Sequence, residues 1–214
     1  MKRNKKTLTC LLLFCFIFSL VSVCAESASA MVGPVREWKF DEAGGTTATD
    51  TSGQGKHGTI AREEQRVVDE TRGKVLEFAG AADAVQVPPS PFNNQANWTF
   101  SAYLKPTTIA GEACCLYAAR AKDPAVPEDE LIYFSISITA DDRIKIETWH
   151  KTRDPKVDSY QTASGVITRG AWNYLHITLE NATAAAQSGT VTCYVNGIPV
   201  AGDPPEGGLG IASV

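Results

Sequence analysis

The sequence lacks the excess of basic residues that nucleic-acid-binding proteins carry. Its 214 residues contain 20 Lys and Arg against 24 Asp and Glu, which gives a formal net charge of −4. The hydrophobic share of 43% and the charged share of 21% are ordinary for one globular domain. This composition excludes a disordered chain, a collagen and a polytopic membrane protein, and it makes nucleic acid an unexpected partner.

A hydrophobic run long enough to cross a membrane is also lacking. The apolar stretch over residues 8–23 follows four basic residues, and it is shorter than the roughly 20 residues that a membrane span needs. This arrangement is typical of a signal peptide. We therefore predict a signal peptide over residues 1–30, cleaved after Ala25 or Ala30, and a single domain over residues 31–214 without a transmembrane segment.

Removal of the signal peptide makes the chain more acidic. It takes away four basic residues and one acidic residue, so that 16 basic and 23 acidic residues remain and the net charge becomes −7. The prediction places the protein outside the cell or in the cell envelope, and the Lys-rich start looks bacterial. A lipoprotein site at Cys24 is the alternative, but Val23 precedes it where such sites normally carry Gly, Ala or Ser.

Cysteine is scarce in the predicted exported part. Three of the six cysteines lie in the signal peptide, and the others are Cys114, Cys115 and Cys193. This number is too small for a disulfide scaffold, and the spacing fits no zinc motif. We expect small buried apolar residues, with a bridge from one of the adjacent cysteines to Cys193 as the alternative.

Helical periodicity is nearly absent after the signal peptide. Apolar and polar side chains alternate over residues 85–87, 134–138, 143–147 and 175–179, which is the period of half-buried strands. Turn residues separate these runs, and the Asn-Gly pair within residues 194–200 predicts a tight hairpin. The fold class is therefore all-β, an antiparallel sandwich or barrel.

Motifs of catalytic chemistry are lacking as well. A glycosidase needs two carboxylates that flank the scissile bond, whereas the acidic run over residues 128–130 lies in a Pro-bearing loop. The chain contains no G-x-S-x-G elbow, no P-loop and no H-E-x-x-H motif, and it has three histidines in all. We do not expect an enzyme.

Five sequence blocks, in order along the chain, resemble a known family. The blocks cover residues 38–58, 73–88, 98–106, 172–178 and 191–197, and begin with Trp38-Lys39-Phe40-Asp41, Gly73-Lys74-Val75-Leu76, Trp98-Thr99-Phe100-Ser101, Trp172-Asn173-Tyr174-Leu175 and Val191-Thr192-Cys193-Tyr194. Together they resemble bacterial laminin-G-like, concanavalin A-like jelly-roll domains. Tyr103 stands where the family usually has Trp.

The resemblance implies a β-sandwich, but this sequence does not contain the final strands of the family. Members of the family run on for roughly another strand or two after a segment like residues 209–211, through a Gly-x-Ile-Asp-Glu stretch. This sequence ends at Val214. The resemblance therefore implies a domain that is incomplete at its C-terminus or a fragment of a larger surface protein.

The resemblance also implies a calcium site in the first block. Family members often hold calcium there with carboxylates and backbone carbonyls, and these positions correspond to Asp41 and Asp50 here. Calcium takes six to eight oxygen ligands, and a further family ligand comes from the stretch that this chain lacks. The alternative is local, with Asp50 forming an Asx turn and Glu42 a solvated turn residue.

Alternation places a set of aromatic side chains on the outside of the strands. If the aliphatic positions face the core, the outward aromatic residues are Tyr103, Tyr133, Trp149, Tyr174 and Tyr194. Aromatic rings stack on the apolar faces of sugars while neighbouring groups bind the hydroxyls. These five residues are the predicted ligand site, with Trp149 as the strongest candidate. The alternative is that the rings form cross-strand pairs that stabilise the sheet.

These observations predict an exported, non-catalytic module that binds a carbohydrate or a cell-surface polymer. The alternative is a structural or adhesive module that contacts other surface proteins. The fold class alone does not decide between them, because such sandwiches carry many functions. Clustering of the outward rings on one surface favours the first, and scattered or buried rings favour the second.

Overall fold

The computed structural model describes residues 33–80, 82–88, 95–109, 111–120, 132–149, 157–182 and 189–203. The predicted signal peptide and the last residues therefore lie outside the described part of the chain. Among the described residues, the regular elements are strands, apart from the short 3-10 helix η2 (Glu63–Gln65). In chain order they are β1 (Thr47–Ala48), β2 (Gly58–Ile60), β3 (Arg66–Asp69), β4 (Gly73–Leu76), β5 (Val85–Gln86), β6 (Trp98–Leu104), β7 (Glu112–Arg120), β8 (Ile132–Thr139), β9 (Ile144–Trp149), β10 (Val157–Thr162), β11 (Asn173–Glu180), β12 (Thr190–Val195), β13 (Ile198–Val200) and β14 (Gly202–Asp203).

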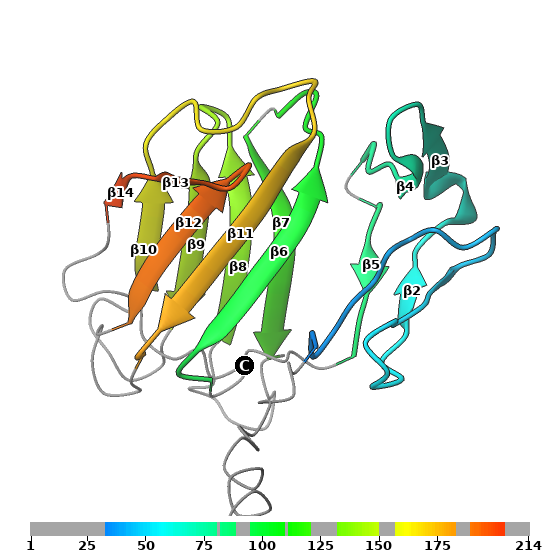
Figure 1. Ribbon diagram of the computed structural model, residues 1–214, viewed down its shortest axis with the longest axis horizontal. Coiled ribbons are helices and arrows are strands. Elements are labelled where there is room, and N and C mark those ends of the chain that lie inside the picture. Colours follow the sequence, from blue (N-terminus) through cyan, green and yellow to red (C-terminus); the bar gives the residue numbers. More distant parts are fainter. Residues whose placement is uncertain are drawn as a thin grey trace, which may run out of the picture.

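Two antiparallel sheets form a sandwich, as Figure 1 shows. One sheet has the order β13-β12-β11-β6 and the other the order β14-β10-β9-β8-β7. In the second sheet β7 to β10 pair consecutively and β14 joins β10, whereas in the first sheet β6 lies beside β11, far along the chain. The expected all-β antiparallel sandwich is thereby confirmed.

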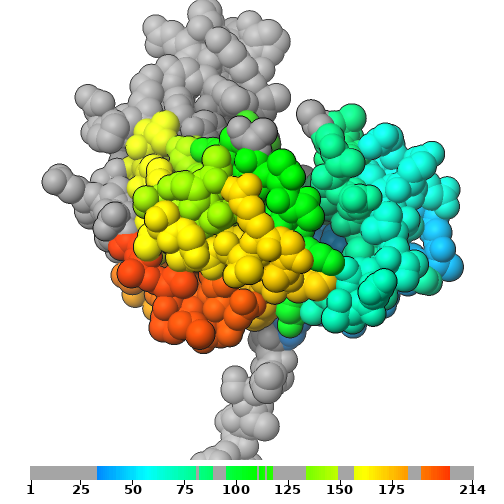
Figure 2. Space-filling model, turned by 90° about the horizontal axis from the view of Figure 1, so that it is seen from above, coloured from blue at the N-terminus to red at the C-terminus, as the bar shows by residue number. Residues whose placement is uncertain are grey.

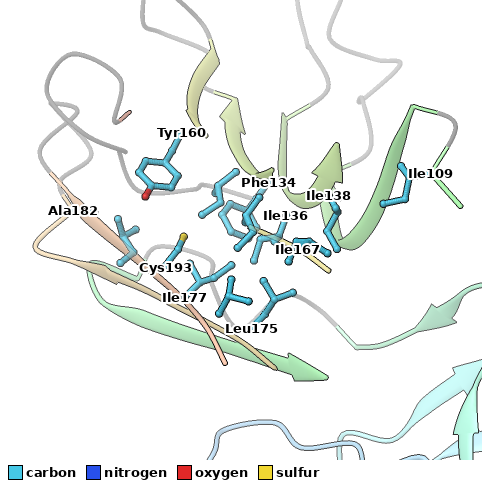
Figure 3. Close-up of a cluster of buried hydrophobic side chains, with 14 residues drawn as sticks. Ile109, Phe134, Ile136, Ile138, Tyr160, Ile167, Leu175, Ile177, Ala182 and Cys193 are labelled. Atoms are coloured by element: carbon cyan, nitrogen blue, oxygen red, sulfur yellow. The ribbon is translucent and has the colours of Figure 1, made fainter. Parts of the chain in front are cut away.

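The core lies between the two sheets (Figure 3). Alternate residues of β8 and β9 point into it from one side, and alternate residues of β11 and β12 meet them from the other. The fully buried aliphatic and aromatic side chains are Phe134, Ile136, Ile138, Ile144, Ile146, Leu175, Ile177 and Leu179. Burial of a side chain of this size stabilises the fold by about 1.5 to 3 kcal/mol, so this layer holds the sandwich together.

The predicted hairpin and one of the cysteine expectations are confirmed. Asn196 and Gly197 both have positive φ, at 53° and 80°, and they connect β12 to β13, as a type I′ turn requires. Cys193 is buried in the core, and burial raises the pKa of its thiol to about 12. Cys115 and Cys193 are both free of disulfide bonds, and the side chain of Cys114 lies outside the described part.

Residues 33–80 and 82–88 form a smaller N-terminal lobe beside the sandwich (Figures 1 and 2). It contains a sheet of order β1-β2-β5 and the hairpin β3-β4. Arg66 organises this lobe, because its guanidinium donates hydrogen bonds to the carbonyl oxygens of Gly45 and Thr47 and to the carboxylate of Glu42. Glu42 is therefore an ion-pair partner within the lobe and not only a solvated turn residue.

Candidate functional site

The outer face of the four-stranded sheet carries a group of aromatic side chains. Buried and more exposed residues alternate along β6 and β11, so odd positions of β6 and even positions of β11 point away from the core. Tyr103, Tyr174, His176 and Tyr194 lie on this side, and we call these four residues the aromatic face. Three of them are among the five predicted ligand residues.

The rings of the aromatic face contact one another across the strands. Tyr103 and Tyr174 are partners in the pairing of β6 with β11, and their ring centroids lie 4.7 Å apart. His176 and Tyr194 are partners in the pairing of β11 with β12, and their centroids lie 5.7 Å apart. A distance of 6.3 Å between the centroids of Tyr174 and His176 links the two pairs. The rings therefore form one continuous row over three strands.

These contacts match the expected cross-strand pairs, yet the rings stay accessible. Tyr103 is 52% exposed, and the other three residues of the aromatic face are half-buried. A pair of aromatic rings adds about 0.5 to 1.5 kcal/mol beyond its area burial. The same rings can therefore stabilise the sheet and offer a surface to a ligand.

Hydroxyl groups border the rings on the same face. A row of threonines crosses β6, β11 and β12 and consists of Thr99, Thr178 and Thr192. Each threonine lies two residues along its strand from the neighbouring row, which contains His176. Ser101 lies opposite His176, and its hydroxyl is 2.9 Å from Nδ1 of that ring. Rings beside hydroxyl groups are the combination that recognises a sugar, which has apolar C–H faces and polar edges.

The turn of the β3-β4 hairpin reaches the edge of this face. Asp69 accepts hydrogen bonds from Nζ of Lys105 at 2.8 Å and from the indole N–H of Trp172 at 3.1 Å. It also accepts the backbone N–H groups of Thr71 and Arg72, at 2.8 and 3.0 Å. The ammonium of Lys105, the Thr71 N–H and the Trp172 indole hold the pKa of the Asp69 carboxyl well below its usual range. Asp69 thus fixes the N-terminal lobe to the sandwich.

Arg72 extends the row of rings beyond the sheet. Its guanidinium carbon lies 3.4 Å from the ring centroid of Tyr103 and 5.3 Å from that of Trp172. Both are cation–π contacts. The residue is exposed, and Gly73, which follows it, takes the positive φ of 70° that lets the chain turn into β4. One face of Tyr103 is therefore covered by an arginine from the N-terminal lobe.

Tyr133 and Trp149 belong to the other sheet. Tyr133 lies in β8, where it pairs with Ala119, and Trp149 lies in β9, where it pairs with Val157. Their side chains lie outside the described part of the structure. The structure therefore brings together three of the five predicted aromatic residues and places the other two on strands of the five-stranded sheet.

The outer face of the five-stranded sheet carries a charged group. Nζ of Lys145 lies 2.7 Å from Glu112 and 3.0 Å from Glu147, and the hydroxyl of Ser137 donates to Glu112 at 3.2 Å. Burial lowers the pKa of Lys145, but the hydrogen bonds that its ammonium donates to the two glutamates outweigh this effect, so the pKa is raised. We call these four residues the ion-pair face.

The carboxylate of Asp50 is engaged by backbone donors. Oδ1 accepts the N–H groups of Glu37 and Ser52 at 3.2 and 2.9 Å, and Oδ2 accepts the N–H of Lys56 at 2.8 Å. Hydrogen bonding by Ser52, joined by the N–H groups of Lys56 and Glu37, holds the pKa of this carboxyl well below its usual range. The bond to Ser52 N–H is the Asx turn that the sequence offers as the alternative to a metal ligand.

Asp50, one of the two residues predicted to hold calcium, already accepts three backbone hydrogen bonds. A carboxylate has about four acceptor positions, and three on Asp50 face N–H donors whose positive ends would oppose a cation. Asp41 is exposed and lies outside this group of contacts. Within the described ranges, no cluster of three or more His, Cys, Asp or Glu side chains could hold a metal. Calcium at Asp41 and Asp50 remains only a prediction.

Sequence reasoning missed the residues that the N-terminal lobe adds to the site. Arg72 is recognisable in the sequence only as part of an Arg-Gly turn, and Trp172 only as part of a family block. The indole of Trp172 meets Asp69 across 103 residues of chain, and no local pattern indicates such a contact. His176 lies on the outer side of β11, and its position between two tyrosine rings depends on the pairing of three strands.

The fold is an antiparallel β-sandwich, and sequence comparison agrees with this fold. The model of the concanavalin A-like lectin/glucanases superfamily matches residues 79–212, and the chain belongs to this family. The description of the family covers both binding proteins and enzymes. Residues 33–78 of the N-terminal lobe precede the match, so Asp69 and Arg72 lie outside the matched residues.

A solved structure also resembles the chain. It is a crystal structure of residues 221–444 of an S-layer domain-containing protein from Clostridium thermocellum, with a TM-score of 0.48 and 21% sequence identity. The match covers 82% of this chain and 73% of that one. No curated protein matches the sequence. In the part of the chain that is described, no helix is long and apolar enough to cross a membrane.

Proposed function

We propose that the chain is an exported, non-catalytic module that binds a carbohydrate or a cell-surface polymer on the aromatic face. The observation that carries the proposal is the continuous row of rings formed by Tyr103, Tyr174, His176 and Tyr194. Export rests on the predicted signal peptide, and a bacterial cell envelope or the extracellular space is the proposed location.

The row has the chemistry that a sugar ligand requires. The hydroxyls of Tyr103, Tyr174 and Tyr194 form no hydrogen bonds with other residues of the described ranges, so they can bind the hydroxyls of a ligand. Rigid aromatic side chains also lose little conformational entropy on binding. A row over three strands is suited to several successive sugar units and therefore to a polymer.

The charged group on the opposite sheet supports a binding role over a hydrolytic one. A glycosidase needs one carboxylic acid and one carboxylate that are both free to act on the substrate. Glu112 and Glu147 are instead bridged by the ammonium of Lys145. Both carboxylates are thus engaged with a cation of the protein itself.

Two tyrosines of nearly equal exposure allow a matched test. Tyr103 is 52% exposed on the four-stranded sheet and Tyr117 is 55% exposed on strand β7 of the other sheet. We expect Tyr103→Ala and Tyr174→Ala to lower affinity for polysaccharides by about tenfold or more, and Tyr117→Ala to leave it unchanged. The measurement is a glycan array followed by calorimetry with the purified chain.

The same experiment tests the remaining predictions. Trp149→Ala and Tyr133→Ala report whether the five-stranded sheet contributes to binding. Chelation of divalent ions should leave affinity unchanged, because N–H groups engage the Asp50 carboxylate. A folded protein that binds no glycan on the array would contradict the proposal and favour a structural module that contacts other surface proteins.

A further inference from the structure

The row of rings on the aromatic face ends at the guanidinium of Arg72. Lys105 at the same edge pairs with Asp69 at 2.8 Å, so these two charges cancel locally. Among the described residues, no carboxylate forms an ion pair with the guanidinium of Arg72. The chain as a whole is acidic, with a net charge of −4, so this local positive charge is not part of a general basic surface.

The guanidinium of Arg72 is held in a defined orientation. It stacks at 3.4 Å on the ring of Tyr103 and lies 5.3 Å from the ring of Trp172. Its backbone N–H is fixed by Asp69, which Lys105 and Trp172 anchor in turn. A side chain that is already ordered loses less entropy when a ligand binds.

Stacking occupies the flat face of a guanidinium and leaves its N–H groups on the edge. These donors match the two oxygens of a carboxylate or a sulfate group, and a charge-assisted pair of this kind is stronger than a neutral hydrogen bond. The edge lies next to the tyrosine row, where the rings of a sugar chain would lie. A ligand with an acidic group on a sugar unit therefore meets both chemistries at once.

We propose that the aromatic face and Arg72 together select an acidic polysaccharide, and that the β3-β4 hairpin is the element that determines this preference. The inference rests on the proposed function and deepens it. The sugar ring stacks on Tyr174 and Tyr194, and its carboxylate or sulfate group accepts hydrogen bonds from Arg72.

Pairs of polymers with the same backbone test the preference. Calorimetry or affinity electrophoresis is run with polygalacturonate against its fully methyl-esterified form, and with dextran sulfate against dextran. We expect at least one acidic polymer to bind about tenfold more tightly than its neutral partner. Preference for polygalacturonate assigns a carboxylate as the recognised group, and preference for dextran sulfate assigns a sulfate.

Substitutions on the hairpin assign the effect to Arg72. Arg72→Ala should bring the ratio of acidic to neutral affinity close to one, and Arg72→Lys should restore part of it, since a lysine keeps the charge but loses the planar fork. Lys74→Ala is the matched control, because it removes the same charge from an exposed position of the same hairpin and should leave the ratio unchanged. Raising the salt concentration should weaken binding of the acidic polymer and leave binding of the neutral one unchanged.

The outcomes separate this inference from the proposed function. Equal affinity for acidic and neutral polymers, with loss in Tyr174→Ala, overturns the inference and leaves the proposed function standing. A ratio that survives Arg72→Ala also overturns the inference. Binding of none of the four polymers, nor of any glycan on the array, overturns both.

Discussion

The two outer faces of the sandwich are built on the same core but differ in whether their polar groups pair with one another. On the ion-pair face, the ammonium of Lys145 meets Glu112 and Glu147, and Ser137 completes the group. On the aromatic face, the hydroxyls of Tyr103 and Tyr194 bind no described residue, and the guanidinium of Arg72 stacks on a ring. A face whose polar groups satisfy one another has little left for a ligand, whereas open donors beside rings are suited to one.

The comparison depends on the core that both faces share, so its largest disturbance is a cavity there. Ile177 is fully buried on β11, between the sheets. We expect Ile177→Ala to lower the free energy of unfolding by about 2 to 5 kcal/mol, and Ile177→Val to lower it by about 0.5 to 1.5 kcal/mol. Urea unfolding followed by circular dichroism measures both. An equal effect of the two substitutions would contradict the tight packing of this layer.

The ion-pair face can be broken without touching the aromatic face. Lys145→Met leaves Glu112 and Glu147 facing each other without a cation. Because the ammonium is half-buried, with 18% of its side chain exposed, we expect a loss of about 1 to 2 kcal/mol in unfolding free energy. The loss should be smaller at high salt, and calorimetry should show unchanged affinity for polysaccharides. A drop in affinity would contradict the placement of the ligand site on the four-stranded sheet.

The aromatic face can be altered with little change of shape at Thr178, which lies in the threonine row of β11. Thr178→Val replaces a hydroxyl by a methyl group. We expect affinity for a polysaccharide to fall by about threefold to tenfold, which corresponds to one neutral hydrogen bond. Ser135→Ala removes a hydroxyl from β8, in the opposite sheet, and serves as the control in the same calorimetric experiment. Equal affinity of the wild type and Thr178→Val would contradict a role of the threonine row in ligand binding.

The anchor between the lobe and the sandwich should depend on pH in a defined direction. The pKa of Asp69 is lowered in the folded chain, so its ionised form stabilises the fold at every pH above its ordinary value of about 4. This contribution is lost as the pH falls from there toward the folded pKa. The difference in melting temperature between the wild type and Asp69→Asn should be constant from pH 7 to about pH 5 and shrink below about pH 4. A difference that persists unchanged to pH 3 would contradict this role of Asp69.

The sequence was sufficient to predict β8, β9 and β11 and the side of each of these strands that faces the core. Alternation of apolar residues in β9 and β11 and the Asn196-Gly197 turn are local signals, and the structure has the strands and the turn where they were predicted. Alternation cannot say which strands share a sheet, because that is decided by pairing between distant segments. For this reason Tyr133 and Trp149 were grouped with aromatic residues that lie on the opposite sheet.

The electrostatic part of the site was beyond prediction for a similar reason. Asp50 is an example at short range, because the sequence around it is compatible both with a metal ligand and with an Asx turn. The N–H groups of Glu37 and Lys56 that engage its carboxylate come from elsewhere in the lobe. Arg72 is an example at long range, because its contact with Tyr103 exists only once the hairpin has docked on the sandwich.

The turn of the β3-β4 hairpin lies outside the hydrophobic core of the sandwich. The sandwich core contains no residue of the turn at residues 70–72, and Arg72 packs on the surface of the sheet. Substitutions in this short turn can therefore change which polymer is preferred while the core stays intact. Under the proposed binding mode, such a division would let one sandwich acquire new ligands through exchange of a single surface hairpin.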